Sequence, residues 1–192
     1  MGSLNKKDTR KEILRRLNAM DPNEHQQYSE EITSIVMAQE AYQKAKTIGV
    51  TLSRFPEVDT IPLIKAAWAD GKQVAVPKCI QSTHEMDFRR LTSFDELETV
   101  YMDLQEPIVD QTVSVEQADI DLQIVPGVVY SLDGYRIGFG GGYYDRYLST
   151  FKGTTISLAF SCQLKETVPF EQHDIPVQMI ITEAKKINTG KK

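Results

Sequence analysis

A glycine-rich loop in the second half of the chain constrains the fold more than any other stretch. An apolar run over residues 122–130 comes first, and the turn pair Asp133-Gly134 follows it. Four of the five positions 138–142 are then glycine, namely Gly138, Gly140, Gly141 and Gly142. The glycines stop at the sequence YYDRYL, which begins at Tyr143 and is typical of the first turns of a helix. The stretch therefore predicts a strand, a turn, a glycine loop and a helix, in that order.

This succession has the chemistry of a phosphate site. Glycine lets backbone N–H groups approach an oxyanion closely, and the start of a helix offers unpaired donors and a partial positive charge. Arg136 precedes the loop, where its guanidinium is placed to hold phosphate oxygens, and Asp145 follows it as a candidate metal ligand. A loop in which glycine only permits tight turns is the alternative. The density of glycines and their charged and aromatic neighbours favour the phosphate site.

The wider stretch resembles the signature of a known family. The chain has Pro126-Gly127, then the turn DGYR over residues 133–136, then GFGGGYYDR over residues 138–146. This succession resembles the signature of the 5-formyltetrahydrofolate cyclo-ligase (5,10-methenyltetrahydrofolate synthetase) family, with a slightly different spacing in the turn. The resemblance implies a ligase of one-carbon folate metabolism. Its substrates would be 5-formyltetrahydrofolate and ATP, its products 5,10-methenyltetrahydrofolate, ADP and phosphate, and its cofactor magnesium.

The resemblance also implies roles for individual residues. The catalytic residues would be Arg136 and Asp145, and Asp145 would bind the metal. The ATP-binding residues would be Lys6, Arg10, Arg136, Ile137, Gly138, Phe139, Gly140, Gly141, Gly142, Tyr143 and Tyr144. The folate-binding residues would be Leu52, Glu57, Phe139, Gly140, Gly141, Gly142 and Tyr143. Lys6 and Arg10 lie four residues apart in a predicted helix, so they share one of its faces.

Two positions depart from the family pattern. Family members commonly carry a second acidic residue near the last strand, and this chain has Gln178 at that position. Some members place a lysine at the position of Gly141. A neutral amide oxygen binds magnesium less strongly than a carboxylate does. Without the lysine, more of the phosphate charge falls to Lys6, Arg10 and Arg136.

The alternation of strand and helix patterns predicts an α/β fold with three layers, in which helices flank a largely parallel sheet. Helices are expected over residues 5–20, 21–46, 62–70 and 143–151. Strands are expected over residues 47–52, 73–79, 86–91, 119–125, 154–160 and 179–182. Residues 93–107 favour a short helix and a loop, and residues 183–192 favour a frayed tail. Parallel sheets bind ligands beyond the carboxyl ends of their strands, so we expect the loops at Ser53, Lys78, Gly138 and Cys162 to share one face.

Composition limits the possible partners and cellular compartment of the protein. The 192 residues are 41% hydrophobic with a net charge of −5, which suits one domain over residues 1–192 and disfavours nucleic acid or an anionic membrane as partner. Cys79 and Cys162 form no CxxC pattern, and no apolar run is long enough for a membrane span. We therefore expect a cytoplasmic monomer that binds small molecules.

Several readings remain open from the residues alone. An isomerase or transferase acting on phosphorylated sugars or coenzyme A thioesters would also use a glycine loop, and so would a non-catalytic nucleotide-binding module. Glu57 would serve equally as a partner of a helix dipole. Of the histidines, His25 favours the surface and His84 has no partner pattern.

Overall fold

The computed structural model of the protein describes residues 5–190. Within these residues the main sheet has seven strands in the order β12-β11-β9-β6-β1-β2-β3. Strands β11, β9, β6, β1 and β2 run parallel, whereas β3 and β12 pair antiparallel at the two edges. The strands are β1 (Thr47–Gly49), β2 (Gln73–Ile80), β3 (Glu85–Leu91), β6 (Leu122–Ile124), β9 (Thr154–Leu158), β11 (Met179–Ile181) and β12 (Lys186–Asn188).

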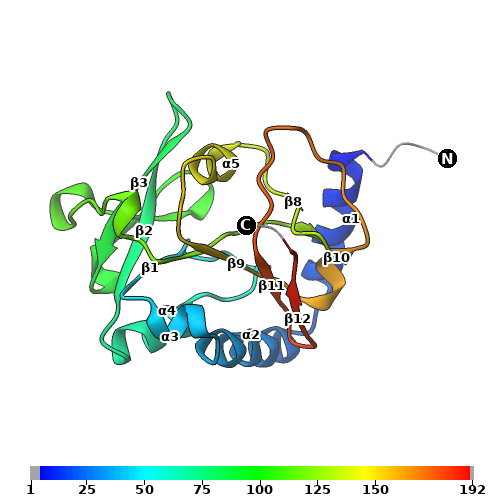
Figure 1. Ribbon diagram of the computed structural model, residues 1–192, viewed down its shortest axis with the longest axis horizontal. Helices are drawn as coiled ribbons and strands as arrows, with labels where there is room; N and C mark the ends of the chain where they lie inside the picture. Colours follow the sequence, from blue (N-terminus) through cyan, green and yellow to red (C-terminus); the bar gives the residue numbers. More distant parts are fainter. Residues whose placement is uncertain (1–4, 191–192) are drawn as a thin grey trace.

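Helices cover both faces of this sheet, which confirms the predicted three-layer α/β fold. The helices α2 (Pro22–Met37), α3 (Glu40–Lys44) and α4 (Ile61–Ala69) lie along one face, and α5 (Tyr143–Leu148) lies on the other (Figure 1). Helix α1 (Lys6–Asn18) lies at one end of the molecule. No helix within residues 5–190 is long and apolar enough to cross a membrane.

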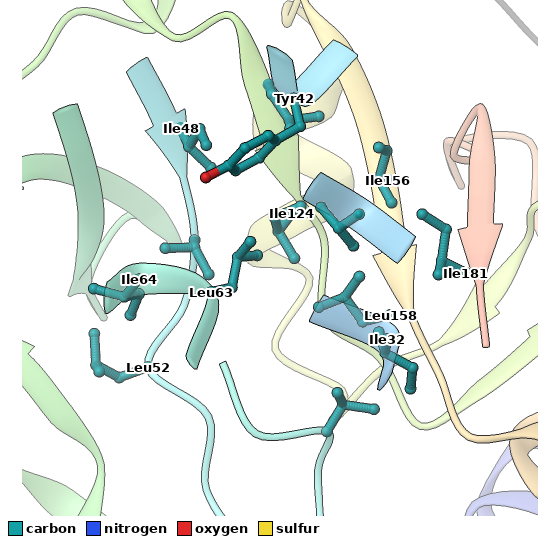
Figure 2. Close-up of a cluster of buried hydrophobic side chains, with 14 of the residues drawn as sticks. Ile32, Tyr42, Ile48, Leu52, Leu63, Ile64, Ile124, Ile156, Leu158 and Ile181 are labelled. Carbon is teal, nitrogen blue, oxygen red and sulfur yellow. The ribbon is translucent and has the colours of Figure 1, made fainter. Parts of the chain in front are cut away.

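The main core lies between the sheet and helices α2 to α4 (Figure 2). Branched side chains from four neighbouring strands point into it, namely Ile48, Ile124, Ile156 and Ile181. They meet Ile32 of α2 and Leu63 of α4, and all of these side chains are buried. Burial of such a side chain stabilises the fold by about 1.5–3 kcal/mol.

The second predicted helix is wrong in its length. Asp21 caps its start as predicted, because its carboxylate accepts from the N–H groups of Asn23 and Glu24. The helix ends at Met37, however, and the backbone is extended at Gln39 before α3 begins. This break turns Tyr42 toward α4, where its hydroxyl donates to Asp70 at 2.6 Å.

A small second sheet carries the glycine loop. It has the strand order β10-β7-β8, with β7 (Val129–Ser131), β8 (Arg136–Ile137) and β10 (Leu164–Lys165). Strands β7 and β8 form a hairpin whose turn contains Gly134 at φ +96°, a value that favours glycine. Gly138 follows a strand as expected, but that strand is β8 of the small sheet and not a strand of the main parallel sheet.

Three other expectations fail at least in part, because hairpin pairing between neighbouring segments overrides local pattern. Residues 93–107 contain a short 3-10 helix as expected, but an antiparallel hairpin of β4 (Leu97–Thr99) and β5 (Gln105–Pro107) replaces the expected loop. Lys78 lies inside β2 and pairs with Glu98 and Glu106 of this hairpin. The tail predicted to fray contains β12, which pairs with β11. Strand β1 also ends at Gly49 and α5 at Leu148, both earlier than predicted.

Short 3-10 helices fill the connections. They are η1 (Phe94–Glu96), η2 (Tyr101–Asp103), η3 (Val109–Gln111), η4 (Gln117–Asp119) and η5 (Ser161–Gln163). The last of these packs near α1 and leads into β10, so it joins the main sheet to the small one.

The edge strand β12 gives a direct test of the fold. Ending the chain at Lys185 would remove Ile187, which packs on a cluster of buried side chains that includes Val125, Tyr130 and Ile180. It would also remove the hydrogen bond from the Thr189 N–H to the Gln178 carbonyl. We expect a loss of about 2–4 kcal/mol of unfolding free energy, at about 1 kcal/mol for each lost hydrogen bond plus the apolar burial. Urea denaturation of the truncated and full chains measures it. An unchanged midpoint would contradict the pairing of β12.

Candidate functional site

The glycine loop has open space beside it. A side chain added at Gly138 would meet no atom within 4 Å, so packing does not require glycine there; Gly142 also has open space beside it, at a φ of +72° that favours glycine. Among the residues that the structure describes, no acceptor is assigned to the backbone N–H groups of residues 139–142. Unpaired backbone donors beside open space suit an anionic ligand.

Cationic side chains gather around this loop from two elements. On α1, the Arg10 Nε donates to the Gly138 carbonyl at 2.7 Å, and the Lys6 Nζ lies 3.3 Å from an Asp174 carboxylate oxygen. On β8, Arg136 donates to the Ile175 carbonyl at 3.0 Å and to the Asp145 carboxylate at 3.2 Å. The fold thus brings together the three predicted cations, although they lie far apart in the sequence.

Asp145 is the acidic side chain of the site. Its Oδ1 accepts from Arg136 and from the Ile175 N–H at 3.1 Å, and its side chain is 25% exposed. No cluster of three His, Cys, Asp or Glu side chains that could hold a metal occurs in the described residues. Magnesium bound with a nucleotide needs only one or two protein carboxylates, since phosphate and water oxygens complete its shell. Asp145 fits that requirement.

Gln178 does not join Asp145. Its side-chain oxygen accepts a hydrogen bond from the Thr155 backbone N–H at 3.2 Å, and the Gln178 backbone N–H donates to the Thr155 hydroxyl at 3.0 Å. The residue at the expected second metal position therefore fastens the start of β11 to the start of β9. The neighbouring acidic side chain is that of Asp174, which pairs with Lys6.

The two tyrosines after the loop point in different directions. The ring of Tyr143 packs on Gly141, since a Cβ added at Gly141 would lie 2.7 Å from the ring carbons. The centroids of the Tyr143 and His84 rings are 5.3 Å apart. The Tyr144 hydroxyl contacts the Thr51 hydroxyl beyond β1, and burial raises the pKa of Tyr144. Tyr143 thus shapes the loop, whereas Tyr144 ties α5 to the main sheet.

A cavity lies beyond the carboxyl ends of β1, β6 and β9, as expected for a parallel sheet. The cavity proper is small, about 30 Å³, within about 390 Å³ of empty space that includes open solvent. Its polar lining includes Thr51, Ser53, Glu57 and Gln163, and Gly127 and Tyr130 are also in its wall. Since Thr51 contacts Tyr144, the cavity adjoins the helix that follows the glycine loop.

Glu57 supplies the carboxylate of this cavity. Its Oε2 accepts from the Arg54 N–H at 2.9 Å. Burial raises the pKa of Glu57, and the Arg54 amide and guanidinium oppose that rise only in part. A carboxylate with little solvent and unused acceptor capacity suits a ligand that presents N–H donors.

Three other predicted residues are distributed between core and surface. Leu52 is buried in the main core (Figure 2), so the cavity is lined by its neighbours Thr51 and Ser53. Ile137 is buried in the same core, and Phe139 is 53% exposed on the glycine loop. The side chains of Leu52 and Ile137 therefore support the site from behind.

Sequence reasoning missed two histidines. His25 lies 2.7 Å from the Glu57 carbonyl, and His84 lies 2.9 Å from the Gly141 carbonyl. Both contacts join segments far apart in the chain, so no local spacing signals them. For His25 the sequence contains only a weak indication: Ser29 lies four residues later, so two polar side chains share one face of the helix.

The chain is similar in sequence and in fold to known proteins. The sequence model of the 5-formyltetrahydrofolate cyclo-ligase family matches residues 3–183. The 5-formyltetrahydrofolate cyclo-ligase of Mus musculus is 32% identical over 191 residues, which cover 93% of each chain. That of Escherichia coli K12 is 32% identical over 177 residues, covering 90% of this chain and 97% of the relative. The solved structure of Aquifex aeolicus 5,10-methenyltetrahydrofolate synthetase has a TM-score of 0.85 at 30% identity, covering 97% of this chain and 94% of its own.

The half-buried carboxylate of Glu57 leads to a prediction about stability. Because its pKa is raised in the folded chain, its ionisation disfavours folding as pH rises through that pKa. Glu57→Gln should therefore raise the melting temperature at pH 7 by about 2 °C or more, and the gain should vanish near pH 4. Thermal scans at both pH values measure it.

Glu106→Gln is the matched control. Glu106 is buried, but its carboxylate lies 3.1 Å from the Lys78 ammonium, so its loss should not stabilise the fold. A melting temperature that falls at pH 7 in Glu57→Gln would contradict the unfavourable burial of Glu57.

Proposed function

Since the chain belongs to the 5-formyltetrahydrofolate cyclo-ligase family, we propose that it converts 5-formyltetrahydrofolate into 5,10-methenyltetrahydrofolate, with cleavage of ATP to ADP and phosphate and with magnesium as cofactor. The observation that carries this proposal is the contact between Tyr144 and Thr51. It places the glycine loop, with its unpaired amides and its cations, next to the cavity that contains Glu57. A phosphoryl donor in the first would lie beside a reduced folate in the second.

The reaction explains why two adjacent sites are needed. The formyl oxygen of the substrate is amide-like and a poor leaving group. Transfer of the γ-phosphoryl group breaks its bond to the β-phosphate oxygen, forms a bond to the formyl oxygen and releases ADP. The neighbouring N10 nitrogen then attacks the activated carbon and loses its proton, and the C–O bond breaks as phosphate leaves. Catalysis rests on holding both ligands in line and on balancing phosphoryl charge.

On the nucleotide side, the backbone of residues 138–142 would hold phosphate oxygens together with Lys6, Arg10 and Arg136. Arg10 already contacts Gly138 and lies near Gly140, so its remaining N–H groups are close to the loop. Tyr143 packs on Gly141 and would fix the loop's course around the phosphates. Ile137, Phe139 and Tyr144 would complete this side of the site.

Asp145 would hold the magnesium ion, in keeping with its partly exposed carboxylate beside the loop. When bound, magnesium supplies positive charge that balances the phosphate oxygens during transfer. Arg136 and the Ile175 N–H fix the Asp145 carboxylate by donating to its Oδ1. The Gln178 amide is engaged with Thr155, so we assign it no direct part.

On the folate side, the Glu57 carboxylate would accept N–H groups of the pterin ring. Phe139, Tyr143 and residues 140–142 would lie at the junction of the two sites and contact the reacting end of the folate. Leu52 would act indirectly, because it is buried behind Thr51 and Ser53. This arrangement separates the recognition of folate from that of phosphate.

We propose further that residues 1–192 act as one domain, as a monomer in the cytoplasm, on small molecules and not on nucleic acid or membranes. The net charge of −5 and the two free cysteines support this setting.

The deciding experiment mixes the protein with 5-formyltetrahydrofolate, magnesium and ATP, and follows the near-ultraviolet absorbance of the methenyl product. Growth of that absorbance only when ATP is present would support the proposal. Absence of growth, with ATP still bound in a titration, would replace it with the non-catalytic nucleotide-binding reading.

Asp145→Asn tests the role of the carboxylate. The amide oxygen can still accept from the Ile175 N–H, but the negative charge beside the phosphates is lost. We expect turnover to fall by about a hundredfold or more, together with a lower melting temperature, because Arg136 loses its counter-charge. Turnover is measured below that melting temperature.

Glu171→Gln is the control for this variant, since its carboxylate is 65% exposed and pairs with His173 in the adjoining segment. It should keep the turnover of the unaltered chain. Equal turnover in Asp145→Asn and Glu171→Gln would exclude Asp145 as the metal ligand.

A further inference from the structure

The loop that carries Glu57 is held tightly to the body of the protein. It connects β1 to α4, and its two ends are tied together by Ser53 and Thr60. The Ser53 N–H donates to the Thr60 hydroxyl at 3.0 Å, and the Thr60 N–H donates to the Ser53 hydroxyl oxygen at 2.9 Å. These bonds fix the ends of the loop but leave the main chain around Glu57 to be fixed by other contacts.

The Glu57 N–H donates to the Arg54 carbonyl at 2.9 Å within the loop, and helix α2 supplies the contacts from outside it. His25 and Ser29 stand one helical turn apart and so share a face. The His25 Nε2 lies 2.7 Å from the Glu57 carbonyl oxygen, and the Asp59 N–H donates to the Ser29 hydroxyl oxygen at 3.0 Å. A carbonyl oxygen only accepts, so Nε2 of His25 carries the proton.

The imidazole ring is itself held in place. Its centroid lies 5.1 Å from that of Phe55 and 5.2 Å from that of Phe160. Phe160 is fully buried at the end of β9, whereas Phe55 belongs to the loop. The ring therefore packs against both the loop and the core, and this packing aims its Nε2 at Glu57.

From these contacts we infer that His25 is a positioning residue for folate recognition, because it holds the main chain of Glu57 from α2 and so sets the direction of that carboxylate in the cavity. The carbonyl of Glu57 is fixed by His25, and the carboxylate is fixed by the Arg54 N–H at 2.9 Å. This inference rests on the proposed role of Glu57 in binding the pterin. His25 itself is not among the side chains that line the cavity.

Two substitutions separate the hydrogen bond from the packing. His25→Phe keeps an aromatic ring between Phe55 and Phe160 but has no donor for the Glu57 carbonyl. His25→Gln replaces the ring with a side chain that retains a terminal N–H donor. Tyr28→Phe is the matched control, since it removes a hydroxyl from the same helix and its ring contacts Phe160 but not Glu57.

We expect His25→Phe to raise the KM and the calorimetric Kd for 5-formyltetrahydrofolate about five- to tenfold, in line with the loss of one positioning hydrogen bond. Its kcat and its KM for ATP should stay within about twofold of the unaltered chain, because the glycine loop is untouched. His25→Gln should recover most of the folate affinity, and Tyr28→Phe should change nothing.

Other outcomes would overturn the inference. If His25→Phe binds folate as the unaltered chain does, or weakens folate and ATP equally, His25 does not position Glu57. Failure of the proposed function is seen separately, since Glu57→Gln would then bind folate normally or the unaltered chain would not bind it at all. Calorimetry gives the folate Kd even where turnover is absent, so both questions receive an answer.

Discussion

The buried guanidinium of Arg136 is the interaction on which the site depends. Its side chain is 5% exposed, and it reaches the Asp145 carboxylate of α5 and the Ile175 carbonyl of the segment before β11. A buried cation without such partners would destabilise the fold by several kcal/mol. The small sheet, α5 and the chain near residue 175 must therefore meet, and that meeting places the glycine loop against α1. The same contact that completes the fold also orients the acidic side chain of the site.

Local sequence patterns predicted much of this arrangement, and the reason is visible in particular elements. Asp21-Pro22 marks a helix start through hydrogen bonds within three residues, and β9 is rich in β-branched residues and buried around Ile156. Such signals need no distant partner. The glycine loop was predictable for the same reason, because its conformational demands are encoded in the loop itself.

The predictions were wrong where the structure of a segment depends on the segment that it packs against. The chain around Lys78 turns into a long hairpin because β3 pairs with β2, and Glu98 and Glu106 become strand residues because their hairpin packs there and neutralises that lysine. Strand β12 forms because β11 offers an open edge. His25 acquires its partner only when α2 packs beside the loop of Glu57. The strand pairings are hairpins between neighbouring segments, and His25 lies 32 residues from Glu57, but in neither case does the periodicity of one segment indicate its partner.

The cations of the site differ in their burial and in how firmly they are paired. Lys6 is 36% exposed and pairs with Asp174 at 3.3 Å, a contact of the kind that contributes little when solvent is near. Arg136 is buried, holds two partners and has little room to move. An arriving polyphosphate would therefore draw Lys6 from Asp174 at small energetic cost, while Arg136 would keep Asp145 in place. On this physical ground we propose that Lys6 and Arg10 would follow the phosphates, and that Arg136 would be the fixed point against which the carboxylate, and any magnesium that it binds, is aligned.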